Sequence, residues 1–130
     1  MASAITMRRV GTKAVRAIVD FENLYLHRAF VDMKKNIYGL SALVQNEMKL
    51  DLKSRSLFIF CNERRTLIKI LCFDRSGFAL CLKKLEESKF PWPKDFDEAV
   101  VNVNAPDLEM MLSGINVWSK FKEIHLEQVV

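Results

Sequence analysis

The sequence predicts an α+β domain in which an antiparallel β meander carries two helices packed on it. Three observations lead to this fold class. Three strand-like runs between residues 57 and 85 are joined by short connections. Two other segments place apolar residues at helical spacing. Half of the 130 residues are hydrophobic while Gly and Pro are scarce, which suits the core of one compact domain.

The N-terminal segment is expected to lie outside this domain. Its first 19 residues hold four basic side chains and no acidic one. We interpret residues 1–20 as a loosely attached basic arm and residues 21–130 as the single domain. An upstream start codon, with Met7 nearer the true start, is a second interpretation. Both are favoured over a transit peptide, although Arg-rich, acid-poor leaders can be one.

The domain begins with a weak strand and a helix. "NLYLHRAF" (23–30) is short, apolar and partly alternating. In the segment 31–51, Asp32 is a good N-cap, because its carboxylate would lie at the positive end of a helix. Lys34 and Lys35 then fall in the first turn, where the helix dipole disfavours positive charge, and this slightly favours an anionic partner for them. The apolar stripe of the helix is Ile37, Leu40, Leu43, Val44 and Met48.

Three runs form the predicted meander: "LFIFC" (57–61), "LIKILCF" (67–73) and "FALCLKKL" (78–85). Their short connections indicate antiparallel hairpins. If both connections hold an even number of residues, each side chain can be assigned to a face. One face would carry Leu57, Ile59, Cys61, Ile68, Ile70, Cys72, Ala79 and Cys81. The other would carry Phe58, Phe60, Lys69, Leu71, Phe73, Phe78, Leu80, Leu82 and Lys84. Both are largely apolar, so we expect helices, a second sheet or a second copy of the chain to cover both sides.

The remainder of the chain supplies a break, a strand and a short helix. In "FPWP", Pro91 and Pro93 forbid regular pairing, and Trp92 is expected to pack down as a lid. "AVVNV" (99–103) alternates weakly and indicates a further strand. "APDLEMMLSGI" (105–115) indicates a helix with Pro106 in its first turn. The tail from Asn116 fits either an extension of this helix or a separate amphipathic segment.

The residues offer little for catalysis. His27 and His125 lie near opposite ends of the chain, without metal-ligand neighbours at useful spacing. No P-loop, G-x-G-x-x-G or G-x-S-x-G is present. A Cys61 or Cys81 nucleophile would need a nearby base and a lowered pKa, and the sequence shows neither. We therefore expect no enzyme, no metal site and no cofactor. The three cysteines, Cys72 included, lie in apolar stretches and are interpreted as buried thiols of a cytoplasmic protein.

The charge is unevenly distributed. Residues 49–89 hold ten Lys and Arg against five Asp and Glu, so +5, and residues 95–130 hold two against seven, so −5. The basic half could attract nucleic acid or an acidic partner. The candidate phosphate-binding residues are Arg64, Arg65, Lys69, Lys83, Lys84, Lys34 and Lys35. The phenylalanines beside them could stack on bases, but we favour a core role for them.

Several motifs in order resemble one known family. They occupy residues 32–35, 57–65, 68–71, 73–78, 83–86, 90–93 and 108–115. Together they resemble the TnpB/Orf-two transposition accessory proteins of insertion sequences of the insertion-sequence-66 type. Asn36 stands where that family usually has glycine. Ala105 replaces a capping Ser or Thr, which leaves Asn104 as the available cap.

The resemblance implies a cytoplasmic accessory protein encoded beside a transposase, with the DNA-cutting residues in the transposase. Two hypotheses follow for its mechanism. The first is DNA binding, alone or on the transposase–DNA complex, through the basic residues above. The second is an adaptor or homodimer that docks on the transposase through Trp92 and Phe90, the Phe-rich face and the acidic tail, without contacting DNA. No membrane is expected as a partner.

Overall fold

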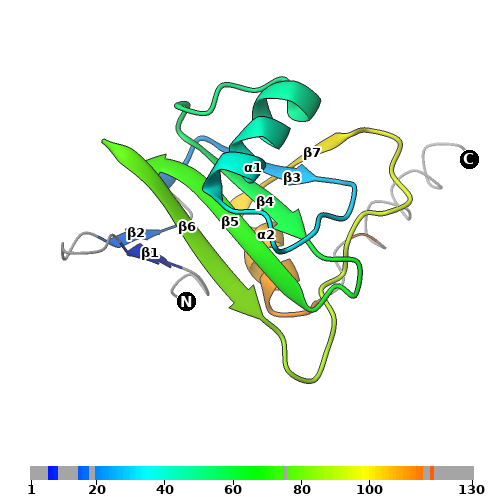
Figure 1. Ribbon diagram of the computed structural model, residues 1–130. Helices are drawn as coiled ribbons and strands as arrows, with labels where there is room; N and C mark the ends of the chain where they lie inside the picture. The colour runs from blue at the N-terminus through cyan, green and yellow to red at the C-terminus, as the bar shows by residue number, and fades with distance from the viewer. Residues whose placement is uncertain (1–5, 9–14, 18–19, 75, 116–117, 119–130) are drawn as a thin grey trace, which may run out of the picture.

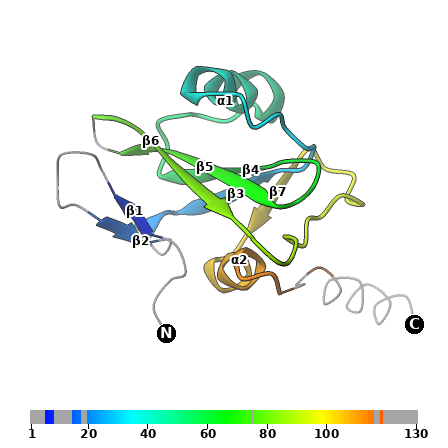
Figure 2. The same ribbon diagram turned by 60° about the horizontal axis from the view of Figure 1, so that its bottom comes forward.

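A computed structural model describes residues 6–8, 15–17, 20–74, 76–115 and 118 of the chain. Its centre is a five-stranded sheet in the order β6-β5-β4-β3-β7. Figure 2 shows α1 on one side of this sheet and α2 on the other. The strands are β3 (Asn23–His27), β4 (Ser56–Cys61), β5 (Leu67–Asp74), β6 (Gly77–Lys84) and β7 (Val100–Val103). The helices are α1 (Ile37–Leu43), its π-helical continuation η2 (Val44–Met48) and α2 (Ala105–Leu112). The predicted α+β class with two packed helices is confirmed.

The meander has the predicted register. In the β4–β5 hairpin Phe58 lies opposite Leu71, and in the β5–β6 hairpin Phe73 lies opposite Phe78. The predicted assignment of side chains to the two faces is therefore confirmed. The six residues between the paired Cys61 and Ile68 satisfy the even count on which the assignment depended.

Strand β3 takes a place that its weak sequence signal did not predict. It pairs parallel to β4 on one side and antiparallel to β7 on the other, so it is an interior strand (Figure 1). The segment α1–η2 crosses from the end of β3 to the start of β4, which makes a β–α–β unit. As a result, the carboxyl ends of β3 and β4 meet at the same end of the sheet.

The predicted start of the first helix is wrong. Asp32 is not its N-cap: its carboxylate accepts a hydrogen bond from Lys34 N at 2.9 Å, which closes a turn instead. The helix begins at Ile37 and is capped by Asn36, whose side chain accepts from Gly39 N at 3.1 Å. Lys34 and Lys35 thus precede the helix, and the argument from the helix dipole does not apply to them.

Two cores lie on the two faces of the sheet. The α2 face packs Leu26, Ile59 and Ile70 against Leu108 of α2 and against the ring of Phe90. The α1 face packs Phe58, Phe60 and Leu71 against the predicted helical stripe, of which Leu40, Val44 and Met48 are buried. The preferred interpretation of the phenylalanines as core residues is confirmed for Phe58 and Phe60, which are fully buried, but it is wrong for Phe78, which is exposed at the edge strand β6.

Two short strands and one tryptophan are described near the two ends of the chain. Within the segment predicted as a basic arm, β1 (Thr6–Arg8) pairs antiparallel with β2 (Val15–Ala17). Figure 2 shows this hairpin on the side of the sheet that carries α2. How tightly residues 1–20 are attached stays a prediction. The predicted C-terminal tail lies outside the described residues except for Trp118, whose Nε1 donates to Pro91 O at 2.7 Å.

Candidate nucleic-acid interface

One end of the sheet gathers the basic residues singled out from the sequence. The ends of β3, β4 and β6 and the start of β5 all lie there, because β3 is parallel to β4 while β5 is antiparallel to both of its neighbours. We call the residues at this place the basic end: Lys34, Lys35, Arg64, Arg65, Lys69, Lys83 and Lys84. Segments up to 50 residues apart in sequence thus contribute to one region, as the phosphate-binding hypothesis requires.

The connection between β4 and β5 is held by one asparagine. The Asn62 side chain accepts hydrogen bonds from Thr66 N at 2.9 Å and Leu67 N at 3.0 Å, and its carbonyl accepts from Arg65 N at 3.0 Å. Arg65 adopts the left-handed backbone conformation with φ 60°. Its carbonyl in turn accepts from Phe90 N at 2.7 Å. The loop is therefore fixed by its own hydrogen bonds, and it presents an exposed Arg64 near its tip.

Lys69 is the lysine in the middle of an apolar strand. Its ammonium donates hydrogen bonds to Met33 O at 2.7 Å and Lys35 O at 2.9 Å. These carbonyls belong to the turn that precedes α1, so Lys69 ties that turn to β5. An ammonium has three donors, and two of them are used within the chain. Lys69 thus positions Lys34 and Lys35, and the structure gives it a role without any phosphate.

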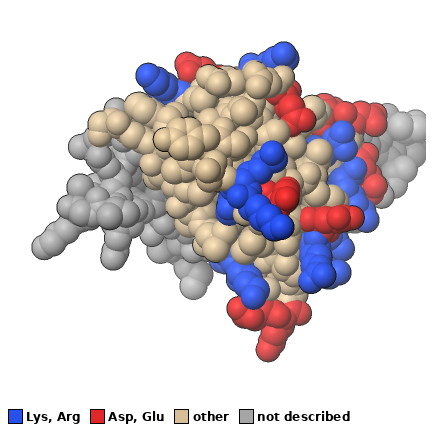
Figure 3. All heavy atoms as spheres, viewed as in Figure 1, with Lys and Arg blue, Asp and Glu red and all other residues tan. Residues whose placement is uncertain are grey.

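Lys83 and Lys84 end β6 on opposite faces of the sheet. Lys84 lies opposite Leu67 on the α1 side and is exposed, while Lys83 lies opposite Ile68 on the α2 side and is half-buried. Figure 3 shows Lys and Arg side chains gathered over the segment that leads into α1, with Asp and Glu among them. The basic end is thus a mixed surface with a positive majority among its exposed long side chains.

A cleft opens between the two connections that follow the parallel strands. It has a volume of about 450 Å³ and is lined by Phe30, Val31, Asp32, Met33, Asn62, Glu63 and Arg64. Val31 N donates to Cys61 O at 2.9 Å and joins its two walls. In sheets with parallel strands, ligands commonly bind beyond the carboxyl ends of the strands, and this cleft has that location. Sequence analysis missed the cleft, because only the parallel pairing of β3 with β4 brings its walls together.

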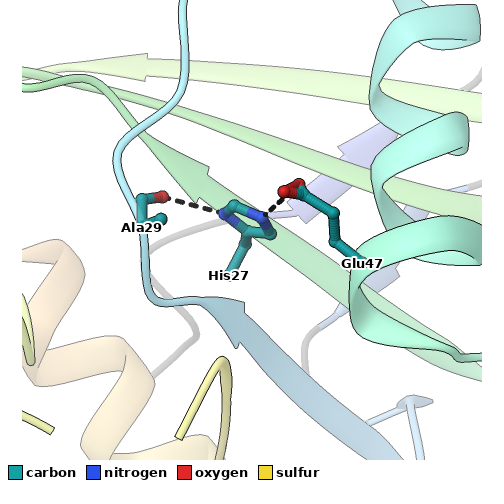
Figure 4. A network of polar contacts seen from close by, with 3 residues as sticks. All are labelled: His27, Ala29 and Glu47. Carbon is teal, nitrogen blue, oxygen red and sulfur yellow. Dashed lines mark hydrogen bonds and ion pairs between the residues drawn. The ribbon is translucent and has the colours of Figure 1, made fainter. Parts of the chain in front are cut away.

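A histidine joins the end of β3 to the helical segment. His27 Nδ1 lies 2.8 Å from Ala29 O and its Nε2 lies 3.2 Å from the Glu47 carboxylate on η2 (Figure 4). The carbonyl can only accept, so Nδ1 carries a hydrogen. Nε2 then donates to Glu47 only when the imidazole is doubly protonated. In that state the pair joins η2 to the end of β3.

Phe90 and Trp92, predicted to contact a partner, lie in the core of the α2 face. Phe90 is fully buried and Trp92 is 4 % exposed, with its Nε1 donating to Arg28 O at 2.8 Å. The expectation that Trp92 packs down as a lid is confirmed. A partner could reach these rings only if the core opened, so they are poor candidates for an interface.

The thiols of Cys61 and Cys81 are poor candidates for a catalytic nucleophile. Burial raises the pKa of the Cys61 thiol from 9.0 to about 12, against the opposing effect of Arg65. Burial also raises the pKa of Cys81. Both thiols therefore stay protonated near neutral pH, which is unfavourable for a nucleophile. Within the described part of the chain, no group of three or more His, Cys, Asp and Glu could hold a metal ion. No helix there is long and apolar enough to cross a membrane.

A protein family and individual proteins match the chain. The family described as "IS66 Orf2 like protein" matches residues 22–122. Two proteins of Sinorhizobium fredii (strain NBRC 101917 / NGR234) are also similar. "Uncharacterized protein y4hO" is 28% identical over 93 residues, covering 72% of this chain and 80% of that protein. "Uncharacterized protein y4jC" is 28% identical over 92 residues, covering 71% of this chain and 77% of that protein. No solved structure matches the chain significantly.

Proposed function

The chain belongs to the family of IS66 Orf2-like proteins, and from this we propose that it is a non-catalytic accessory protein of transposition that binds DNA through the basic end. Membership of the family indicates the accessory role. The contact with DNA is our inference from the arrangement of the basic residues. The transposase of the same element is the protein partner that we propose for the complex on DNA.

The observation that carries the proposal is the convergence of basic residues from separate segments at one end of the sheet. Lys34, Lys35, Arg64 and Lys84 are all exposed there. Cationic side chains on a fixed scaffold are what phosphate contacts need. Lys69 acts indirectly, because its hydrogen bonds to the carbonyls of Met33 and Lys35 hold the first two lysines in place.

The cleft gives this surface a shape as well as a charge. Its lining includes the apolar residues Phe30, Val31 and Met33 together with Arg64. A backbone phosphate at Arg64 would bring an adjoining sugar or base toward the apolar wall. Asp32 and Glu63 also line the cleft, and their negative charges disfavour tight binding of a polyanion. We therefore expect a moderate affinity for DNA that depends strongly on salt concentration.

The test measures DNA affinity against salt for the full chain and for matched variants. Wild-type protein should shift duplex or single-stranded DNA at low ionic strength, with affinity that falls steeply as salt increases. Arg64→Glu should weaken binding and lower the slope of log K against log salt by about one. Lys49→Glu is the control, because Lys49 is exposed and precedes β4, at the opposite end of that strand. Absence of any salt-sensitive shift, or equal losses in both variants, would refute DNA binding at the basic end.

The contribution of the transposase is separated by nuclease treatment. If the chain meets the transposase only on DNA, co-purification of the two proteins should be lost when DNA is digested. Co-purification that survives digestion and also survives Arg64→Glu would instead support the adaptor hypothesis.

A further inference from the structure

Strand β6 exposes an apolar stripe at the edge of the sheet. Phe78 and Leu80 are each 36% exposed and Leu82 is 57% exposed, all on the α1 face. Tyr38 on α1 is 83% exposed. Figure 3 shows an uncharged expanse over α1 and the neighbouring part of β6. This stripe lies beyond the cover of α1 and has no role in the basic end.

Along the same stripe, β6 has backbone groups that point away from β5. Leu85 N donates to Thr66 O at 2.9 Å and so continues the β5–β6 ladder. This bond shows which residues of β6 direct their backbone groups toward β5. Hydrogen-bonded and non-hydrogen-bonded residues alternate along an antiparallel pair. Because Leu85 is hydrogen-bonded to β5, Lys84 and every second residue before it direct their N–H and C=O away from β5. Phe78, Leu80 and Leu82 therefore offer outward backbone groups together with exposed apolar side chains.

This edge also lacks most of the features that prevent strand pairing. Natural edge strands are commonly protected by prolines, bulges or charges in mid-strand. β6 pairs with β5 over all eight of its residues without a bulge, and it contains no proline. Its only charges are Lys83 and Lys84 at one end. Among the described residues, no strand pairs with its outer edge; β1 lies close to β6, but on the side of the sheet that carries α2, whereas the stripe lies on the α1 side (Figure 2).

We propose that β6 pairs antiparallel with β6 of a second copy of the chain, about a two-fold axis perpendicular to the sheet at Leu80. Two five-stranded sheets then become continuous. In this register Phe78 lies opposite the partner's Leu82, and Leu80 lies opposite the partner's Leu80. The apolar stripes of the two copies join into one, on the side of the sheet that carries both α1 helices.

The distribution of charge on β6 favours a second copy of the chain as the partner, and it favours antiparallel pairing. Lys83 and Lys84 stand at one end of the strand, so antiparallel pairing sends the two lysine pairs to opposite ends of the joined strands. Parallel pairing would set them side by side, where like charges destabilise a sheet. A perpendicular two-fold axis also keeps even-numbered residues opposite even-numbered ones, so each apolar side chain meets another. The strand is thus complementary to itself in one direction only.

The dimer does not depend on the proposed DNA contact, since the stripe shares no residue with the basic end, to which β6 contributes only its last two residues, Lys83 and Lys84. Its consequence for that contact is geometric. Two basic ends would face opposite directions along the paired strands, so one dimer could hold two DNA segments.

The experiment measures the mass of the nuclease-treated full chain by sedimentation over a range of concentrations. Wild-type protein should be dimeric. Leu82→Lys should raise the dissociation constant by roughly a hundredfold, because the symmetry counts each lost apolar contact twice. Ile115→Lys is the matched control: Ile115 follows α2, is 54% exposed, and its replacement should leave the dimer intact. Both variants should keep the wild-type circular dichroism spectrum, since neither side chain belongs to the buried core.

A second variant separates strand pairing from packing of the faces. Leu80→Pro removes an outward N–H while leaving the β5 ladder in place, so it should abolish the dimer. A wild-type monomer at every concentration, or equal dimerisation of Leu82→Lys and wild type, would overturn the proposal. A dimer that resists Leu80→Pro but not Leu82→Lys would overturn the pairing of strands and indicate packing of the two stripes face to face.

Discussion

The two faces of the sheet carry similar amounts of apolar sequence, but they are closed to different degrees. On the α2 face, Phe90 and Leu108 are fully buried and Trp92 is nearly so. On the α1 face, Phe58 and Phe60 are fully buried beneath the helix, but Leu82 at the edge is 57% exposed. Both faces thus contain a buried core, but the α1 face also leaves an apolar stripe exposed along β6.

The difference has a geometric origin. Strands lie about 4.8 Å apart and a helix with its side chains is about 10 Å across, so a single helix covers roughly two strands. On the α2 face the segment after β6 extends the cover, because Phe90, Trp92 and the partly buried Phe96 pack there beside α2. On the α1 face the segment after η2 packs Leu52 into the core and places Lys53 Nζ 5.6 Å from the centroid of the Phe73 ring on β5, but no described β6 side chain belongs to that core.

The largest test of this contrast removes one aromatic ring from each face. Phe90→Ala should lower the free energy of unfolding by about 3–5 kcal/mol, because a fully buried ring leaves a cavity in the α2-face core. Phe78→Ala should lower the free energy of unfolding by under about 1 kcal/mol, because the Phe78 side chain is 36% exposed. Its ring makes an edge-to-face contact with Phe73, with 5.3 Å between the ring centroids. Urea unfolding of both variants measures the difference. Equal losses would show that the β6 edge of the α1 face is packed as tightly as the core of the α2 face.

A smaller effect is expected where the α1 face meets the basic end. Lys69→Met should lower the free energy of unfolding by about 1–3 kcal/mol, because it leaves two backbone carbonyls, those of Met33 and Lys35, without their donor. Measured beside it, DNA affinity decides the role of Lys69. Lost stability with DNA affinity intact would mark Lys69 as structural. Intact stability with weakened binding would assign its ammonium to phosphate and contradict the positioning role given above.

The parts of the fold that the sequence predicted are those governed by local alternation. The register of the meander followed from two short connections that each hold an even number of residues. This even number places Phe58 and Lys69 on the same face of the sheet. The family resemblance, confirmed over residues 22–122, covered the same segments. Helix α2 and its Asn104 cap were also within reach of local signals.

What the sequence did not predict depends on contacts between distant segments. The parallel pairing of β3 with β4, and the cleft that it creates, have no periodic signature in the chain. The start of α1 was misassigned because Asp32 and Asn36 are both good caps, and only the structure shows that Asp32 closes a turn. The basic residues could be named in advance, but their meeting at one end of the sheet follows from strand order.

The finest comparison of the two faces uses the two asparagine caps. Asn104 accepts from Asp107 N at 2.8 Å and Asn36 accepts from Gly39 N at 3.1 Å. Replacing either by Ala removes one acceptor, at a cost of about 1 kcal/mol. Helix α2 buries four of its eight residues, whereas α1 buries only Leu40 of its seven. Asn104→Ala should therefore lower the global free energy of unfolding by the full amount, because α2 cannot open without disrupting the core of its face.

For Asn36→Ala we expect part of the loss to appear as local opening of α1, since η2 with its buried Val44 and Met48 stays docked. Native-state hydrogen exchange resolves the two cases. In Asn36→Ala the amides of α1 should exchange faster while those of β4 keep most of their protection. Asn36→Asp retains an acceptor oxygen at the cap and should exchange as the wild type does. If Asn36→Ala instead accelerates α1 and β4 equally, α1 unfolds only with the whole domain, and the open face is as tightly integrated as the closed one.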